Sequence, residues 1–377
     1  MKKLFSIPIF FVLFAICMCV GDCRGMAIAM EPKRTITVSY DAFVECYEEK
    51  EIISNNKFLN SFTPQEILIK LKDMGFSSKE CIDYVYSGIS AKILEVEKVV
   101  NIEPVEADVD VTKGTPIIKH EQMGLVLDEE RLYEDLYNNL IHGDNNIKVN
   151  LKCDKLEPNV KMNEVINYTN EKSSFRTYIN GVNQEGRRLN IKRATQLLNG
   201  IRLLPEEKLS FNQIIGETTK ANGYALAKVI LNGEYKDDYG GGVCQVATTL
   251  YNAALIAGLD IERVRPHSLK VGYVAGSFDA MVSAGVSDLV IKNPYDTPIY
   301  IYSYATDYEC GVKIFGEINE FDIQRRTEIV DFNEEEYPSV SYMSEGYLDY
   351  FKNNELVKTK RIRKDTYKKV KVLEPKP

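Results

Sequence analysis

The chain contains 377 residues, which is enough for two or three domains of ordinary size. Hydrophobic residues make up 44% of it and charged residues 27%, a globular balance that excludes wholesale disorder. The formal net charge of −8 argues against nucleic acid as a partner.

The N-terminus carries the pattern of an export signal. Lys2 and Lys3 precede an uncharged, mostly apolar run of 17 residues from Leu4 to Val20, and the small residues of Ala27-Ile28-Ala29 follow. This order predicts a signal peptide over residues 1–29. The alternative is an uncleaved N-terminal membrane anchor, through which the protein would touch the membrane surface. Either one places the rest of the chain outside the cytoplasm.

A small α+β domain is predicted over residues 30–165. Thr63-Pro64-Gln65-Glu66 forms a capping box with proline at the first helical position, and Gly75 is suited to end that helix. Ser77 and Glu80 start a second helix, whose apolar side continues through Ile82, Val85, Ile89 and Ile93. Residues 107–111 alternate like a strand. A helix over 131–140 and a strand over 149–151 complete this domain.

The densest motif surrounds Cys244. Gly240-Gly241-Gly242-Val243 leads into it, and apolar residues then recur at helical spacing, at Val246, Leu250, Ala254 and Ala257, before Gly258. Cys244 is therefore predicted at a helix N-terminus, where the helix dipole and unpaired N–H groups lower the pKa of a thiol. The three glycines, which packing alone does not readily explain, would let a substrate approach closely. The alternative is a buried, inert structural cysteine.

The cysteine count supports a free thiol. Five cysteines follow residue 29, namely Cys46, Cys81, Cys153, Cys244 and Cys310. An odd number leaves at least one thiol without an intrachain disulfide partner, and such a thiol is a candidate for reactivity. The spacing fits no zinc pattern, so neither a metal nor a cofactor is expected.

A thiolate nucleophile usually works with a base. His267 is the histidine of the cysteine domain, since His120 and His142 lie in the preceding one. Asp279 could orient the ring of His267, which predicts Cys244, His267 and Asp279 as catalytic residues. The alternatives are a structural histidine and an Asx turn or helix cap at Asp279.

A substrate-binding set is predicted around these residues. Arg263 and Arg265 could bind a carboxylate, although a solvated basic turn has the same pattern. Gly241, Gly242, Gln245 and Ser268 adjoin the catalytic candidates and complete the set. Strands are expected over 288–294, 298–302 and 311–314.

A β-rich C-terminal extension is predicted over residues 317–377, with strands such as Val340-Ser341-Tyr342-Met343. From Lys358 to the C-terminus, nine Lys and Arg residues stand against Asp365 and Glu374. This basic run could contact anionic polymer or lipid headgroups. The alternative is a solvated hairpin with a frayed end.

The cysteine domain, predicted over residues 171–316, resembles the VanW domain. The resemblance rests on Leu209-Ser210-Phe211-Asn212, Gly216, Asn222-Gly223-Tyr224, Gly240 through Asn252, His267-Ser268, Tyr273-Val274, Asp279-Ala280 and Asp288-Leu289. The chain departs from the family pattern at Ala247, where serine is more usual, and in the loop at Tyr239-Gly240. Residues 74–164 are similar to a peptidoglycan-binding domain that often precedes VanW, through Glu103-Pro104-Val105-Glu106-Ala107 and Gly124-Leu125-Val126-Leu127-Asp128.

The resemblance implies an α+β cell-wall protein, secreted to the wall or anchored at the outer face of the cytoplasmic membrane. Its implied partners are cell-wall polymer and peptidoglycan stem peptides. Some VanW-domain proteins are regarded as cysteine L,D-transpeptidases that form 3–3 peptidoglycan crosslinks, and Cys244 matches the family's cysteine. Three functions stay open: such an enzyme, a non-catalytic protein that binds peptidoglycan or is associated with glycopeptide resistance, and a polymerised or coat-associated structural protein.

Overall fold

The computed structural model describes residues 35–40, 43–48, 62–142, 146–179, 184–231 and 234–369. The signal peptide or anchor predicted over residues 1–29 lies outside these ranges. The chain divides into two compact units, one formed by residues up to 101 together with 126–154, the other by 102–125 together with 155 onwards. Both units combine helices and strands, which confirms the α+β fold class. In the described ranges, every helix is too short or too polar to span a membrane.

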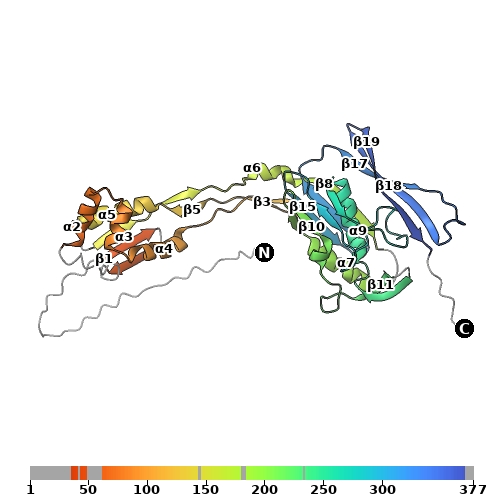
Figure 1. Cartoon of the computed structure of the whole chain (residues 1–377), viewed down its shortest axis with the longest axis horizontal. Coiled ribbons are helices and arrows are strands. Elements are labelled where there is room, and N and C mark those ends of the chain that lie inside the picture. Colours follow the sequence, from red (N-terminus) through yellow and green to blue (C-terminus); the bar gives the residue numbers. More distant parts are fainter. Residues whose placement is uncertain are drawn as a thin grey trace, which may run out of the picture. The chain divides into compact units, whose positions relative to one another are not determined.

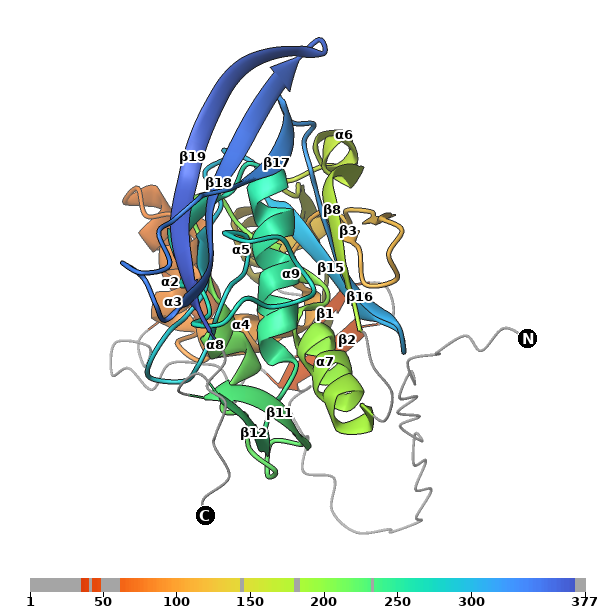
Figure 2. The same cartoon turned by 90° about the vertical axis from the view of Figure 1, so that its right-hand side faces the viewer.

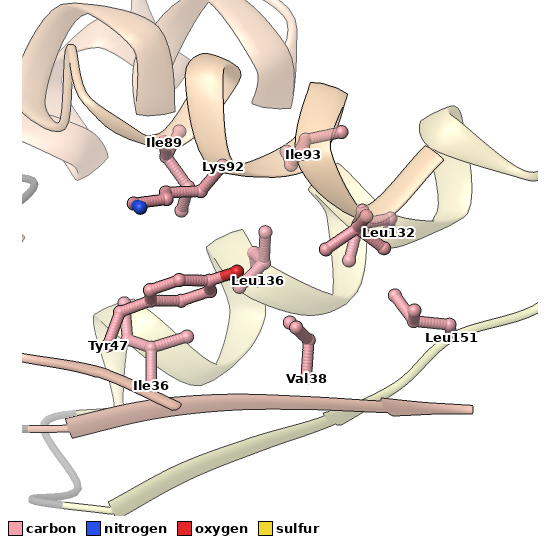
Figure 3. Close-up of a pocket in the computed structure, with 10 residues that line it drawn as sticks. Ile36, Val38, Tyr47, Ile89, Lys92, Ile93, Leu132, Leu136 and Leu151 are labelled. Atoms are coloured by element: carbon pink, nitrogen blue, oxygen red, sulfur yellow. The ribbon is translucent and has the colours of Figure 1, made fainter. Parts of the chain in front are cut away.

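The first unit is a three-stranded sheet covered by helices. β1 (Thr35–Tyr40) lies between β2 (Phe43–Glu48), which is antiparallel to it, and β6 (Asn146–Asn150), which is parallel. Its core joins the sheet to α2 (Pro64–Asp73), α3 (Ser78–Val85), α4 (Ile89–Val100) and α5 (Glu129–Ile141). Figure 3 shows side chains of β1 facing those of α5 across a small cavity with almost entirely apolar walls. Such a cavity has few groups that could hold a sugar or a peptide.

The helix starts of this unit agree with the predicted capping boxes. Thr63 accepts a hydrogen bond from the N–H of Glu66, whose carboxylate accepts the N–H of Thr63, and Ser77 and Glu80 repeat the pattern. The prediction of one continuous second helix was wrong, because α3 ends at Val85 and α4 begins after Gly88. Apolar residues on both sides of the break face one core, so their periodicity hid it.

The second unit is built on a four-stranded antiparallel sheet. Its order is β8 (Asn170–Tyr178), β16 (Glu309–Gly316), β15 (Ile299–Ala305) and β9 (Ile201–Leu203). α9 (Val243–Ile256) packs on β8 and β16, with α7 (Glu185–Leu198) beside it (Figure 2). Because α9 is buried on nearly every side, it forms the centre of the unit's core.

Smaller sheets surround this centre. One contains β10 (Lys208–Ser210), β14 (Val290–Lys292) and β13 (Asp260–Arg263), and α8 (Phe211–Ile215) follows β10. β11 (Leu226–Leu231) and β12 (Glu234–Tyr239) form a hairpin that leads into α9. The C-terminal sheet consists of β17 (Asp322–Ile329), β18 (Val340–Lys352) and β19 (Glu355–Lys368), all antiparallel (Figure 1). β17 packs against α9.

Residues 102–125 belong to the second unit, although the sequence placed them in the first domain. Their hairpin, β3 (Asp108–Asp110) and β4 (Ile117–Lys119), packs on Tyr300 and Phe315. Short helices at α6 (Met162–Val165) and η2 (Ile166–Thr169) follow in the same unit. β5 (Gly124–Leu127) and β7 (Cys153–Leu156) pair where the chain passes between units. An alternating pattern predicts a strand but does not tell which core the strand joins.

Candidate functional site

Cys244 is the second residue of α9. Gly242 caps the helix with a φ of +110°, a backbone conformation that favours glycine. Val243 and Gln245 on either side are buried, whereas Cys244 keeps part of its surface exposed. In its thiol form, Sγ donates to the carbonyl of Val282 at 3.3 Å. The cysteine therefore combines a helix N-terminus with access from solvent.

Close packing accounts for the three glycines before it. A Cβ atom on the first, Gly240, would lie 2.5 Å from Cβ of Thr218. One on the second would lie 2.7 Å from Cβ of Ala227, and one on the third 2.9 Å from Cγ1 of Ile191. All three distances are shorter than Cβ contacts tolerate. The glycine run is thus explained by α7, β11 and a neighbouring loop, and substrate access is not needed to explain it.

A long loop between β13 and β14 brings His267 and Asp279 together. Nδ1 of His267 and Oδ2 of Asp279 are 2.7 Å apart, and the backbone N–H of His267 donates to the same oxygen at 2.6 Å. Both side chains are buried, with 6% of His267 and 1% of Asp279 exposed. The side chains of His267 and Cys244 also lie close enough to interact, and each shifts the pKa of the other.

α9 itself positions this loop. Asn252 donates to the carbonyl of Phe278 at 2.8 Å, and the hydroxyl of Thr248 accepts the N–H of Ala280 at 2.9 Å. These two contacts hold the residues on either side of Asp279. Because Thr248 follows Cys244 by one helical turn, the helix that carries the thiol also places the carboxylate.

The charges favour a thiolate–imidazolium pair. Burial raises the pKa of the Cys244 thiol, but the hydrogen bond and positive charge of His267 lower it below its usual value. Burial lowers the pKa of His267, but its hydrogen bonds with Asp279 and Cys244 and their negative charges raise it to about 9. Burial raises the pKa of Asp279, but His267 and then Arg363 lower it overall. At neutral pH, the arrangement therefore supports a charged nucleophile beside a charged acid.

Arg187 and Tyr273 also belong to this site, and sequence reasoning missed both. Nη2 of Arg187, in α7, donates to Oε1 of Gln245 at 2.6 Å, and its positive charge lowers the pKa of Cys244. Burial and the negative charge of Cys244 raise the pKa of Tyr273, so its hydroxyl stays protonated. Because Arg187 belongs to a separate helix, no local pattern around Cys244 could have indicated it.

The predicted substrate-binding residues fall into a buried group and an exposed group. Gln245 is buried, accepts from Arg187 and donates to Oγ1 of Thr177 and the carbonyl of Tyr178, so its amide positions Arg187. Arg263 and Arg265 are exposed, as is Ser268. Gly241 and Gly242 are buried in the packing described above. Of the predicted substrate-binding residues, Arg263, Arg265 and Ser268 are therefore the ones that a substrate could reach from solvent.

The C-terminal sheet reaches the site as well. Arg363 and Tyr367 of β19 both donate to Oδ1 of Asp279, at 2.9 and 2.7 Å. The predicted basic run is thus divided, because Lys358 and Lys360 are exposed whereas Arg363 points inward. Nothing in the basic composition alone distinguished the inward arginine.

The remaining described thiols differ from Cys244. Cys81 and Cys310 are also free thiols, and burial raises the pKa of both. Cys310 is fully buried against Thr177 and Thr249. Across the ranges that the structure describes, no three His, Cys, Asp or Glu side chains gather as a metal site would require. Of Cys81, Cys244 and Cys310, Cys244 is the one whose thiol pKa is lowered.

Two segments of the chain match known families. Residues 186–315 match the family described as "VanW like protein", and residues 81–148 match the family described as "Putative peptidoglycan binding domain". The chain therefore contains a VanW-like segment, and that segment carries α9, His267, Asp279 and nearly all of α7. Together the two matches indicate a cell-wall-associated protein. The C-terminal sheet lies beyond the VanW-like match.

Two known proteins are similar in sequence to part of this chain. It is 38% identical over 133 residues to "Uncharacterized protein YoaR" of Bacillus subtilis (strain 168), which covers 35% of this chain and 44% of that protein. It is 29% identical over 139 residues to "Vancomycin B-type resistance protein VanW" of Enterococcus faecalis (strain ATCC 700802 / V583), covering 36% of this chain and 50% of that protein. The chain thus spans about half the length of the curated relatives it matches. No solved structure matches it.

Proposed function

We propose that this protein is a cysteine L,D-transpeptidase that acts on peptidoglycan stem peptides and forms 3–3 crosslinks. The observation that carries the proposal is the pairing of His267 with Asp279 at 2.7 Å beside the partly exposed Cys244. A cysteine acyltransferase needs a nucleophile, a base and a group that orients the base. The family matches support the cell wall as the setting.

In the first half-reaction, the Cys244 thiolate attacks the carbonyl carbon of the L,D amide of a donor stem. A carbon–sulfur bond forms and the carbon–nitrogen bond of the amide breaks. The imidazolium of His267 gives its proton to the departing nitrogen, because an amine leaves readily only when it is protonated. The products are a thioester on Cys244 and a free amino acid or peptide.

In the second half-reaction, the amine of an acceptor stem attacks the thioester carbonyl. Neutral His267 takes the proton of that amine, the new amide bond forms, and the carbon–sulfur bond breaks to return the thiolate. Asp279 stabilises the charged form of the His267 ring in both half-reactions. Water in place of the amine would make the protein a carboxypeptidase.

Arg187 has two roles in this scheme. Its charge beside the thiol favours the thiolate, and it would stabilise negative charge that develops on the carbonyl oxygen. Gln245 holds the guanidinium in place at 2.6 Å. Tyr273, protonated and close to the thiol, is the second proton donor available if His267 is not the acid.

The alternative is a protein that binds the cell wall without catalysis. It is favoured by the match of residues 81–148 to a peptidoglycan-binding family. A binding protein needs no thiolate, so the alternative leaves the lowered pKa of Cys244 without a use. Binding and catalysis are also compatible, with the first unit holding the polymer on which the second acts.

The test is incubation of the purified protein with disaccharide tetrapeptides, followed by mass spectrometry. Dimers linked through two third-position residues, with release of the terminal amino acid, are expected. The Cys244→Ala variant should form none, whereas the Cys153→Ala variant should retain activity because Cys153 lies outside the site. Binding to sacculi without dimers or released amino acid would overturn the enzymatic proposal and support the binding alternative.

A further inference from the structure

Both oxygens of the Asp279 carboxylate are fully engaged. Oδ2 accepts the two hydrogen bonds from His267, and Oδ1 accepts one from Nη2 of Arg363 and one from the hydroxyl of Tyr367. Nη1 of Arg363 also donates to the backbone carbonyl of Asp279 at 2.9 Å. Asp279 and Tyr367 are each 1% exposed. A carboxylate held by donors on both oxygens cannot rotate without breaking a buried hydrogen bond.

Arg363 and Tyr367 are themselves held in place. Nε of Arg363 donates to Asp365 at 2.5 Å. The hydroxyl of Tyr367, while donating to Asp279, accepts the N–H of Ser277 at 2.8 Å. Ser277 has a φ of +67°, an unusual conformation for a residue with a side chain, and its hydroxyl bonds to the carbonyl of Ser344 in β18. The segment before Asp279 is therefore attached to two strands of the C-terminal sheet.

A third strand adds two more attachments. Thr327 in β17 donates to the carbonyl of Gly276 at 2.9 Å. Arg325 in the same strand lies half-buried over Phe278 and donates to Asn252 of α9 at 2.5 Å. Asn252 in turn donates to the carbonyl of Phe278. All three strands of the sheet thus contact either the Asp279 loop or the helix that carries Cys244.

We propose that Arg363 and Tyr367 are positioning residues that orient the Asp279 carboxylate toward His267, so that the C-terminal sheet is a required part of the site. This inference rests on the proposed function, since it assigns both side chains to the reaction of Cys244. Neither touches the reacting atoms, and each acts through Asp279. Residues 322–369 lie outside the segment that matches the VanW-like family, so that segment does not hold the complete site.

The groups that face Asp279 set the sign of the expected changes. They are His267 on one side, Arg363 and Tyr367 on the other, and Asp365, Tyr251 and Tyr273 farther out. Arg363 is the permanent cation among them. Removing it leaves the negative charge of Asp279 less balanced, so His267 should hold its proton to higher pH. Removing the Tyr367 hydroxyl changes no charge at neutral pH and only loosens the carboxylate.

The test compares Arg363→Met, Arg363→Lys and Tyr367→Phe in the full-length protein. Arg363→Met should raise the pH at which the His267 ring titrates, followed by NMR, by about one pH unit. Arg363→Lys should return that titration toward the wild-type value. Tyr367→Phe removes one oxygen atom and is expected to fold. It should lower kcat by about 10-fold to 100-fold and leave KM unchanged, because substrate contacts stay intact.

Two matched variants control for general damage to the sheet. Arg361→Met removes an exposed arginine two residues away on β19, where it pairs with Glu345. Tyr347→Phe removes a β18 hydroxyl that bonds to Glu345. Neither should change the His267 titration or kcat.

The outcomes separate this inference from the proposed function. If Arg363→Met and Tyr367→Phe lower the melting temperature but leave the His267 titration and kcat as in the controls, the sheet is only structural and the inference is wrong. If the titration moves as expected while no variant, wild type included, forms crosslinks, the positioning role stands and the transpeptidase proposal fails.

Discussion

His267 donates two hydrogen bonds to one oxygen of Asp279, from its backbone N–H at 2.6 Å and from its protonated Nδ1 at 2.7 Å. The main chain and the ring of His267 are thus fixed by the same buried carboxylate. The ring cannot swing away from Cys244 without breaking one of these bonds. Such an arrangement holds the imidazole in one tautomer and orientation, which is what a base beside a nucleophile requires.

Cys244 should be the most reactive thiol of the protein. Its lowered pKa and partial exposure favour the thiolate, whereas Cys310 is buried with a raised pKa. Mass-spectrometric mapping of iodoacetamide alkylation against pH should show Cys244 modified first and at the lowest pH. Equal rates at Cys81 or Cys310 would mean that the helix start and His267 do not activate the Cys244 thiol.

The rate of acyl transfer should follow a bell-shaped pH profile. The rising limb reports the Cys244 thiolate and should lie below the ordinary thiol range. The falling limb reports loss of the His267 imidazolium as pH rises through about 9. Because the folded pKa of His267 exceeds its unfolded value of 6.5, its contribution to stability is complete below that value and is lost as pH approaches 9.

The stability difference between wild type and His267→Gln should therefore shrink between pH 7 and pH 10. Urea unfolding at each pH measures it. A difference that stays constant over this range would argue against a raised pKa for His267.

His267→Ala and Asp279→Asn should both reduce the transfer rate. Loss of a positioned acid and base costs on the order of 10²–10⁴-fold. Asp279→Asn is expected to cost a similar factor, because an amide nitrogen at this position would face donors from His267, Arg363 or Tyr367. Single-turnover kinetics with each variant gives the factors. Full activity in His267→Ala would mean that another group, with Tyr273 as the first candidate, protonates the leaving amine.

Arg187→Met should raise the pKa of Cys244, since a positive charge beside the thiolate is lost. The midpoint of the alkylation profile measures this change. Arg188→Met is the matched control, because Nε of Arg188 donates to the carbonyl of Asp307 instead. If Arg187→Met and Arg188→Met give the same alkylation profile against pH, Arg187 does not lower the pKa of Cys244.

Gly241→Ala should destabilise the fold by about 1–3 kcal/mol, the usual cost of overpacking a core. The added Cβ would lie 2.7 Å from Cβ of Ala227 and from the carbonyl oxygen of Lys228. Gly272→Ala is the control, as nothing lies within 4 Å of a Cβ there. Chemical denaturation compares the two, and similar stabilities would show that packing does not explain the glycine run.

Features that depend on neighbouring residues could be predicted from the sequence. The capping boxes at Thr63 and Ser77, the start of α9 near Cys244 and its end before Gly258 all follow from interactions within one or two helical turns. His267 was singled out because the other two histidines fall in a different predicted domain. Reasoning of this kind needs only composition and spacing.

Contacts between distant elements could not be predicted in this way. Asp279 meets Arg363 and Tyr367 across 84 and 88 residues, and Arg187 meets Gln245 across 58. The loop that carries His267 and Asp279 has no regular secondary structure, so no periodicity marks the direction of either side chain.

The sequence by itself therefore determined which thiol and which histidine to consider, and the helix start that carries the thiol. Only the tertiary structure decided that the glycines are needed for packing, that residues 102–125 join the second unit, and that the C-terminal sheet holds Asp279. The physical reason is the range of the interactions. Capping and helical spacing act over a few residues, whereas the partners of a buried charge are set by how elements far apart in the chain pack around it.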